Sequence, residues 1–387
     1  MPFVTVIGAG GSTVTVPYTT NQNIAIARQI AANITASVLA GNTVAHQDLT
    51  PPLPAGKTGE FVKTIDGLSV MPAGYSDVVN VSKNAIIYGS GDNGQQILSG
   101  TGNLTFFSSA GSGTLAGGGG NNSIFIAVTD TGSWDINTDV GHNQIVDFGT
   151  GASSISPGGG SNLVQLGGGQ YTVSSTGNDT VVGSTGAETV GVTGTASDVV
   201  VGHSSDLNFI NGQGASTVLG QAGSDTIFAG FGGGLYKGGS AGNNLLQGGF
   251  GAATLQAGGN NDTLIAGPGA APQALFAASG SETLDGSGSS GADTFYGGSG
   301  HATINLGLGT NIVGFIDGSA GGTDIVNSFA SGTDTINLHG YPSGEVSNVV
   351  GNQTLSGGNV TISLSDGTQV TFTSLGHLLT SSDFTTI

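Results

Sequence analysis

Several features that define common protein classes are absent from this chain. None of its 387 residues is cysteine, which excludes disulfide bonds. No run of about 18 apolar residues occurs, so the sequence predicts no membrane span. Only five residues are basic against 24 acidic ones, and the net charge is −19. A surface of that sign repels nucleic acid and anionic lipid, so neither is an expected partner.

Glycine is abundant where other residue types are scarce. It accounts for 74 residues, yet it does not follow the strict triplet of collagen. Apolar residues make up 36% of the chain, a share too high for a disordered tail. A repeat architecture is the class that remains.

One short phrase keeps returning between Gly177 and Asn305. It appears at 177–182, 186–191, 223–228, 260–265, 280–285 and 291–296, as in Gly-Asn-Asp-Thr-Val-Val and Gly-Ser-Asp-Thr-Ile-Phe. The apolar residue after the threonine or its substitute mostly recurs every 9 to 11 residues or about twice that, at Val181, Val190, Val218, Ile227, Leu245, Leu255, Leu264, Leu284, Phe295 and Ile304. A fixed short period with glycine at the corners is typical of a β-helix or β-roll.

The period also predicts how the chain is wound. Each apolar residue points inward from a short strand, and the glycines turn the chain because they reach positive φ without a Cβ clash. Two units make one coil, and successive coils stack as parallel strands about 4.8 Å apart. The same period is present in weaker form further upstream, at Ile86, Ile97, Phe106, Leu115, Ile124, Ile136, Ile145, Ile155, Leu163 and Val173. We therefore expect one solenoid over residues 84–315.

Residues 1–83 differ from the repeats and predict a small α+β cap. A strand pair is expected over 4–16, around a Gly-rich turn. Its Val-Ile-Gly-Ala-Gly-Gly start superficially resembles a dinucleotide loop, but Thr13 occupies the third glycine position and a strand is expected where a helix should follow. A helix is expected over 21–40 with an apolar stripe along one side. It is either a lid that hides open strand edges of the first coil or a docking helix for another subunit.

Residues 316–387 again change character. Segments 360–364 and 370–372 predict a hairpin on the turn Asp366-Gly367. The predicted fold is thus all-β, a parallel β-solenoid with an N-terminal α+β cap and a C-terminal β-hairpin segment, in three parts: 1–83, 84–315 and 316–387.

The repeat phrases resemble the RTX (hemolysin-type, Gly-Gly-x-Gly-x-Asp) family of secreted bacterial proteins. In that family the turn aspartates and neighbouring carbonyls hold calcium. The resemblance implies calcium ligands at the matching positions, Asp179, Asp225, Asp262 and Asp293, with near matches at Glu188 and Glu282. Asn122 and Asn244 stand where an aspartate would be, and Ala253 and Ala302 drop the ligand. Calcium prefers several oxygen ligands at once, so few or weak sites are expected.

The C-terminal segment carries the same resemblance. Residues 322–338 are similar to the closing segment of RTX-type proteins, and 378–387 looks like the uncleaved signal used by type I secretion. The first residues lack the basic start of a Sec signal peptide. Together these features imply export to the outside or surface of a Gram-negative bacterium.

Catalytic groupings are poor, and the chain is not expected to be an enzyme. The Gly-x-Ser-x-Gly match at 238–242 is a chance product of composition. The six histidines show no metal-ligand spacing, and the pair Glu282 and Asp285 lies at repeat turns. The weak hint of a polysaccharide-cleaving groove is Trp134 with Asp135 and Asp139.

The charge distribution indicates how the chain is used. Residues 1–83 hold four basic and four acidic residues, whereas 84–387 hold 20 acidic residues against Lys237 alone. Such a surface attracts divalent cations or the more basic end of a sister molecule; the alternative is that it serves solubility alone.

A thin core and open strand edges predict association with copies of the same chain. We expect a secreted structural protein that forms a filament, surface layer or biofilm matrix, with cell-surface or matrix polysaccharide as a further partner. The alternative is a calcium-dependent adhesin that binds polysaccharide or ice, the latter suggested by the threonine before each core residue.

Overall fold

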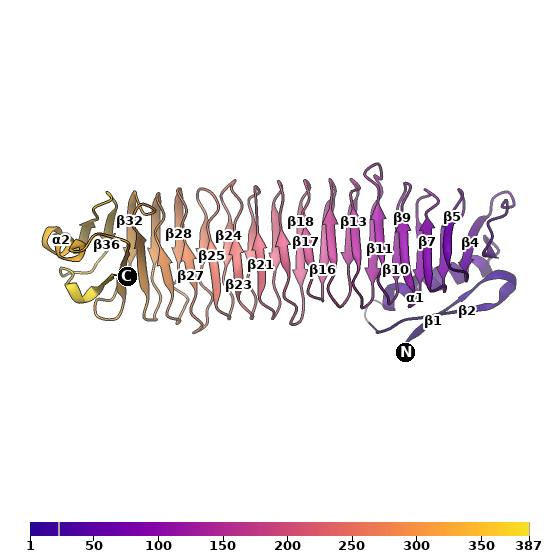
Figure 1. Ribbon diagram of the computed structural model, residues 1–387, viewed down its shortest axis with the longest axis horizontal. Coiled ribbons are helices and arrows are strands. Elements are labelled where there is room, and N and C mark those ends of the chain that lie inside the picture. The colour runs from indigo at the N-terminus through magenta and orange to yellow at the C-terminus, as the bar shows by residue number, and fades with distance from the viewer. Residues whose placement is uncertain (22–23, 387) are drawn as a thin grey trace. The chain divides into compact units, whose positions relative to one another are not determined.

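The computed structural model describes residues 1–21 and 24–386. The chain divides into two compact units, Met1–Val200 and Val201–Ile387. Each unit consists almost wholly of short parallel strands wound as a β-solenoid (Figure 1). The all-β prediction is therefore confirmed.

The N-terminal unit contains two parallel sheets that share the turns of the solenoid. One sheet packs against the helix α1 (Ile24–Leu39) and is called the helix-side sheet. Its strand order is β3 (Thr43–Gln47), β4 (Thr58–Lys63), β6 (Asp77–Asn80), β8 (Gln95–Ser99), β10 (Gly113–Gly117), β12 (Trp134–Thr138), β14 (Ala152–Ser156), β16 (Gln170–Ser175) and β18 (Glu188–Val192). The opposite sheet follows the order β5 (Gly67–Val70), β7 (Asn84–Tyr88), β9 (Asn103–Phe107), β11 (Ser123–Ile126), β13 (Gln144–Asp147), β15 (Leu163–Leu166) and β17 (Thr180–Val182). A short strand, β19 (Val199–Val201), lies at the unit boundary.

Strict register keeps one or two apolar residues of most strands in the core, as with Ile124 and Ile126 of β11. In the helix-side sheet, Ile97, Leu115 and Ile136 are direct cross-strand partners and are fully buried. Because successive side chains in a strand alternate between faces, this register fixes which residues point to solvent.

Three of the predicted inward positions are wrong by one residue. Ile86, Leu163 and Leu245 point outward, and their neighbours Ile87, Val164 and Leu246 are fully buried instead. At each position two apolar residues follow one another, so composition alone does not choose between them. The pleat and the register of the adjacent strands make the choice.

The predicted strand pair and helix of the N-terminal segment are both confirmed. β1 (Phe3–Ile7) and β2 (Thr13–Pro17) pair antiparallel around η1 (Ala9–Gly11). The helix α1 (Ile24–Leu39) follows; residues 22–23 of its predicted span lie outside the described part.

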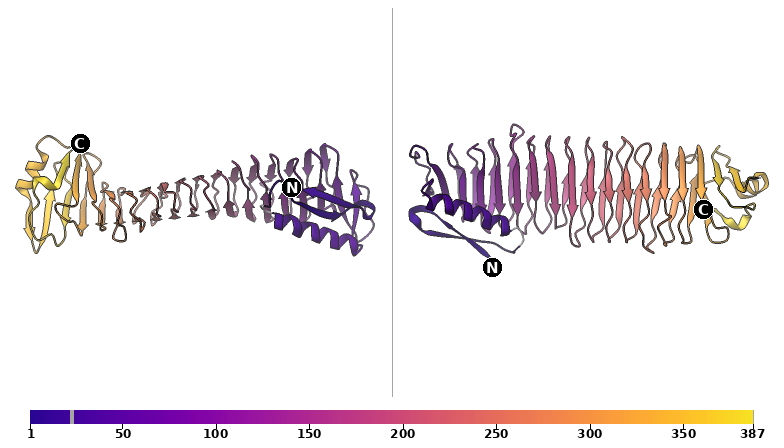
Figure 2. Two further views of the ribbon diagram at one scale, coloured as in Figure 1. Left: turned by 90° about the horizontal axis from the view of Figure 1, so that it is seen from below. Right: turned by 180° about the vertical axis from the view of Figure 1, so that it is seen from behind.

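The position of α1 differs from the lid interpretation. Buried residues of α1 and of the hairpin form one apolar cluster with the outward side chains Val62, Val79, Leu98 and Ala116 of β4, β6, β8 and β10. Seen from behind, α1 lies in front of this sheet (Figure 2). The helix thus covers an outer face of the first turns of the solenoid. Parallel pairing already begins with β3 and β4, so the boundary predicted near residue 84 is too late.

The C-terminal unit has the same construction. Its first sheet follows the order β20 (Leu207–Ile210), β22 (Thr226–Phe228), β24 (Leu245–Gln247), β26 (Thr263–Ile265), β28 (Ser281–Asp285), β30 (His301–Asn305), β32 (Thr323–Asn327) and β36 (Gln369–Phe372). Its second sheet follows the order β21 (Ser216–Leu219), β23 (Gly234–Lys237), β25 (Ala253–Gln256), β27 (Ala274–Phe276), β29 (Thr294–Tyr296), β31 (Ile312–Ile316), β33 (Thr335–His339) and β37 (Phe384–Thr386).

The last turns of this unit carry the predicted hairpin. β35 (Asn359–Ser363) pairs antiparallel with β36, and Gly367 in the turn has a φ of 93°. β34 (Thr354–Ser356) extends the hairpin, and the helix α2 (Glu345–Asn352) was not predicted. The segment that resembles a secretion signal contains η2 (Ser381–Asp383) and β37, which docks parallel to β33.

Candidate functional site

The aspartates that the sequence singled out belong to ladders of buried hydrogen bonds. In the N-terminal unit, the backbone N–H of Asn122 donates to Oδ1 of Asn143 one turn later, at 3.0 Å. Asn143 donates in the same way to Asn162 at 2.8 Å, and Asn162 to Asp179 at 3.0 Å. Asp179 then donates to Asp198 at 2.6 Å. Each of these side chains is buried, so each one supplies the acceptor that a buried N–H needs.

The C-terminal unit repeats this arrangement in both of its sheets. In the first sheet, the N–H groups of Asp225 and Asn244 donate to Asn244 and Asp262, at 2.7 and 2.8 Å. In the second sheet, the N–H of Gln273 donates to Oδ1 of Asp293 at 2.8 Å. A second bond in this sheet joins the N–H of Asp293 to Asn311 at 3.3 Å, and in the first sheet Asp225 accepts from the N–H of Leu207 at 3.0 Å. All four predicted metal ligands are therefore ladder acceptors.

The ladder explains why asparagine and aspartate alternate at one repeat position. The essential group is a carbonyl or carboxylate oxygen, which both side chains provide. Asparagine adds a donor: Nδ2 of Asn162 lies 2.7 Å from Oδ1 of Asp179, and Nδ2 of Asn244 lies 2.8 Å from Oδ1 of Asp262. Asparagine in place of aspartate weakens the calcium pattern, but it preserves the acceptor of the ladder and can add a second hydrogen bond.

Two of the four aspartates, Asp179 and Asp262, have both carboxylate oxygens engaged by hydrogen bonds from the chain itself. Calcium takes six to eight oxygen ligands, several of them carboxylates. Oδ2 of Asp179 accepts from the Ser175 hydroxyl at 2.7 Å, and Oδ2 of Asp262 accepts from the N–H of Gly258 at 2.8 Å. Among the described residues, no group of three or more histidine, cysteine, aspartate or glutamate side chains is placed to hold a metal.

The near matches are buried as well, but their carboxylates accept from N–H groups of their own turns, as Glu188 does from Ser184. Glu188 and Glu282 are both buried, and Oε1 of Glu282 accepts from the N–H of Gly280 at 2.9 Å. Ala253 and Ala302 are also buried, and the N–H of Ala302 donates to Asp324 at 2.7 Å.

Burial shifts the pKa of many of these acids upward, because it disfavours the charged form. It raises the pKa of Asp198 and of Asp225 to about 6 and that of Asp324 to about 7. Outside the ladders, burial raises the pKa of Glu60 to about 8, with a further contribution from Asp77. Glu60 and Asp77 are direct cross-strand partners on β4 and β6.

The residues that hinted at a polysaccharide groove have internal partners. Trp134 is 1% exposed, and its Nε1 donates to Oδ2 of Asp130 at 3.1 Å. Asp139 is fully buried and accepts from the N–H groups of Thr19 and Thr20, both at 2.9 Å. Asp139 thus fixes the connection from the hairpin towards α1. Asp135 is half-buried and accepts from Nδ2 of Asn137 at 2.7 Å.

The remaining catalytic candidates are not brought together. On β28, Glu282 is buried whereas Asp285 lies on the other face, because strand residues three apart point to opposite sides. Ser240, the serine of the Gly-x-Ser-x-Gly match, lies in an exposed turn with no helix after it.

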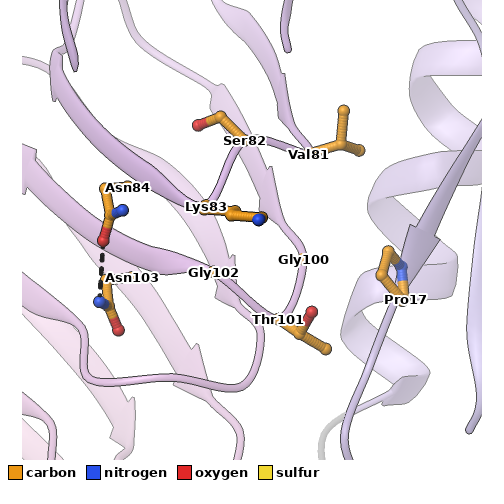
Figure 3. A pocket seen from close by; sticks show the side chains of 9 residues that line it. All are labelled: Pro17, Val81, Ser82, Lys83, Asn84, Gly100, Thr101, Gly102 and Asn103. Atoms are coloured by element: carbon orange, nitrogen blue, oxygen red, sulfur yellow. Dashed lines mark hydrogen bonds between the residues drawn. The ribbon is translucent and has the colours of Figure 1, made fainter. Parts of the chain in front are cut away.

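A pocket of about 300 Å³ lies beside the end of β2 (Figure 3). It is lined by Pro17 and by the corner residues 81–84 and 100–103, and the side chain of Asn103 donates to Asn84 at 3.0 Å. Lys83 is its one charged lining residue. Since no acid, histidine or cysteine lines it, the pocket has no acid–base pair.

The most unusual surface is an apolar one on the outside of the opposite sheet. The rings of Tyr88 and Phe107 stack with centroids 4.7 Å apart, and those of Phe107 and Phe125 with centroids 5.0 Å apart. Leu68 and Val70 of β5 and Ile86 of β7 are exposed next to them. We call these six residues the aromatic face. The sequence analysis did not predict this face, because it used the repeat only to place inward residues. The feature that indicates the face is a second apolar residue directly before or after a core position.

The C-terminal unit has smaller stacked pairs. Phe276 and Tyr296 have centroids 4.7 Å apart, and Phe231 and Phe250 have centroids 4.9 Å apart. Among the described residues, no helix is long and apolar enough to cross a membrane. Comparison with protein-family models gave no match, and comparison with curated proteins gave none either. What the chain does must therefore be inferred from its own fold and surfaces.

Proposed function

We propose that this chain is a secreted structural protein that assembles with copies of itself outside the cell, as a filament, surface layer or biofilm matrix. The observation that carries the proposal is the edge strand β5. Among the described strands it pairs with β7 alone, so its second edge offers free N–H and C=O groups. It exposes Leu68 and Val70, by 62% and 61%. Neither lysine nor proline, the usual protections of an edge strand, occurs in it.

Two further features support this proposal. Most strands place only one or two apolar residues in the core. Each turn therefore makes few apolar contacts, and association with another molecule adds stability that a single copy lacks. The resemblance of the repeats and of the C-terminal segment to RTX-type proteins supports export from a Gram-negative cell. The proposal assigns no catalysis to the chain.

The alternative, a calcium-dependent adhesin for sugar or ice, has less support. Its four aspartates already serve as ladder acceptors. The stacked rings of the aromatic face cover one another, whereas sugar binding usually requires an open ring face.

The full chain should be tested by electron microscopy and sedimentation over a range of protein concentrations, with calcium and with a chelator. We expect ordered polymers in both solutions. They should increase as salt is raised from about 0.02 M to about 0.3 M, because salt screens the repulsion between acidic surfaces. A chain that stays monomeric under every condition contradicts the proposal, and polymers that disappear in chelator favour a role for calcium.

An edge variant makes the test specific. Val70→Lys places a charge on the open edge, and Gln165→Lys places the same charge on β15, which has a neighbour on each side. We expect Val70→Lys to raise the concentration needed for polymers about tenfold, which corresponds to about 1.4 kcal/mol per contact. Gln165→Lys should leave it nearly unchanged.

A further inference from the structure

The proposed function assigns a contact to the open edge of β5 and none to the outer face beside that edge. Resting on that function, we infer that two copies of the chain associate face to face through the aromatic face of the N-terminal unit. The contact is isologous, so the same six residues meet their counterparts in the second copy.

The register of the opposite sheet makes the aromatic face continuous. Val70 is the cross-strand partner of Tyr88, Tyr88 of Phe107, and Phe107 of Phe125, so these side chains form one column. Leu68 and Ile86 are also partners and begin a second column beside it. Ring planes in the stack differ by 17° and 12°. The columns are therefore regular ridges with grooves between them, a shape that a second copy can match at the same strand spacing.

The surface is apolar although it is open to solvent. Ile86 is 40% exposed and Tyr88 is 42% exposed, and the two side chains of β5 are more exposed still. Contiguous exposed apolar side chains mark interaction surfaces more often than isolated ones do.

The two outer faces of the first turns differ in whether another part of the chain covers them. Outward apolar residues of the helix-side sheet, such as Val79 and Leu98, are covered by α1 and the hairpin. The outward residues of β5 and β7 have no such cover among the described residues, and these strands face the viewer in Figure 1. A second molecule buries the apolar side chains of this face, as α1 buries those of the other face.

The charge distribution identifies that molecule as another copy. Residues 1–125 hold four basic and five acidic residues, a net charge of −1 (4 − 5). Residues 126–387 hold one basic and 19 acidic residues, a net charge of −18 (1 − 19). Copies therefore repel one another least where the aromatic face lies, and a basic partner would be drawn to the rest of the chain instead.

Cross-linking tests this contact directly, since the chain has no cysteine of its own. Thr105 is half-buried on β9 and is the cross-strand partner of Ile86 and Ser123, within the proposed contact. Facing sheets pack about 10 Å apart, which is too far for a disulfide but within reach of a short bis-maleimide. We expect Thr105→Cys to give covalent dimers. The matched control is Thr254→Cys, also half-buried and outward in the C-terminal unit, and it should give few.

A charge variant provides the second measurement. Ile86→Glu places two like charges in the contact and should raise the dimer dissociation constant, measured by sedimentation equilibrium, at least about tenfold. Phe276→Glu changes a stacked outward ring in the C-terminal unit and should not. Far-UV circular dichroism and unfolding curves verify that both variants are folded.

The outcomes separate this inference from the function on which it rests. If polymers form but neither variant differs from its control, the inference is wrong and the proposed function stands. If Thr105→Cys gives dimers while no polymers form, the inference stands and the proposed function falls. If the wild type is monomeric throughout, both fail. If Ile86→Glu instead abolishes retention on an insoluble polysaccharide such as cellulose, the occupant is polysaccharide and the inference is again wrong.

Discussion

At the residue scale, the Asn/Asp ladder is the main polar feature of the fold. Backbone N–H groups at the corners are buried, and each one is paired with a side chain from the next turn, as Asn122 is with Asn143. Leaving such a group unpaired costs about 1–3 kcal/mol. The ladder is therefore a condition for stacking the turns, and it needs no metal ion to operate.

Replacing Asp179 by asparagine distinguishes the ladder from a calcium site. Asparagine keeps the acceptor for Asn162 and removes a buried charge, since burial raises the pKa of Asp179. At pH 7.5 we expect Asp179→Asn to raise the free energy of unfolding, because a neutral amide avoids the cost of burying a charge. Urea unfolding, with and without calcium, measures this. A loss of stability in calcium alone would assign Asp179 to metal binding.

Asn143→Ala is the matching loss-of-ladder variant. It removes the acceptor of the Asn122 N–H and should cost about 1–3 kcal/mol. Thr129→Ala changes an exposed turn residue of the same unit and should stay within about 0.5 kcal/mol.

At the element scale, α1 and the hairpin complete the first turns. Their apolar residues cover outward side chains of four strands that would otherwise be exposed. The first turns carry apolar side chains on both of their outer faces, and each face needs such a cover. α1 and the hairpin cover one of the two faces.

Ile34→Ala tests the contribution of α1. Ile34 is fully buried in the shared cluster, and its truncation should cost about 2–4 kcal/mol and loosen the helix. Unfolding curves and the binding of a hydrophobic dye report the two effects. Arg28→Ala, on the exposed side of α1, should change stability by less than about 0.5 kcal/mol. Equal effects of the two variants would contradict this packing.

The elements also show how far the sequence alone can lead. The winding was predictable because the chain repeats one local pattern, in which glycine corners separate short strands with buried apolar residues. The errors at Ile86, Leu163 and Leu245 arise where two apolar residues are adjacent and only neighbouring strands decide between them.

The candidate sites were less predictable than the winding. The stripe on α1 indicated that the helix packs, but not against which surface. Aspartates such as Asp225 look alike in sequence whether they bind a metal or accept a hydrogen bond from the next turn. The aromatic face requires knowledge of register, because Tyr88 and Phe107 are 19 residues apart and meet only as cross-strand partners.

At the scale of the whole molecule, a high negative charge is combined with the burial of many acidic side chains, and burial disfavours their charged form. The chain has a net charge of −19, and many of its acids are buried. Those acids with raised pKa values favour the folded state when protonated. Their contribution is complete below the pKa of the unfolded chain, about 4, and is lost as pH rises through the folded values.

Stability should therefore decrease between about pH 4 and about pH 8. The pKa values concerned are about 6 for Asp77, Asp198 and Asp225, about 7 for Asp324 and about 8 for Glu60. Thermal unfolding at several pH values measures the decrease, and Glu60→Gln should remove the part of it that Glu60 contributes between about pH 4 and about pH 8. The control is Asp66→Asn, because backbone hydrogen bonding from Asn84 lowers the pKa of Asp66 and it stays ionised over this range. A melting temperature that is constant or rises with pH contradicts the prediction.

The ladder has a consequence for how long such a chain can become. Each rung depends only on the rung that follows it, as Asn143 depends on Asn162. A barrel must close and a globule must fill its volume, but this pattern imposes neither condition. Tandem duplication or loss of one complete turn within a unit leaves every remaining donor with an acceptor, so length is a property that evolution can adjust one turn at a time.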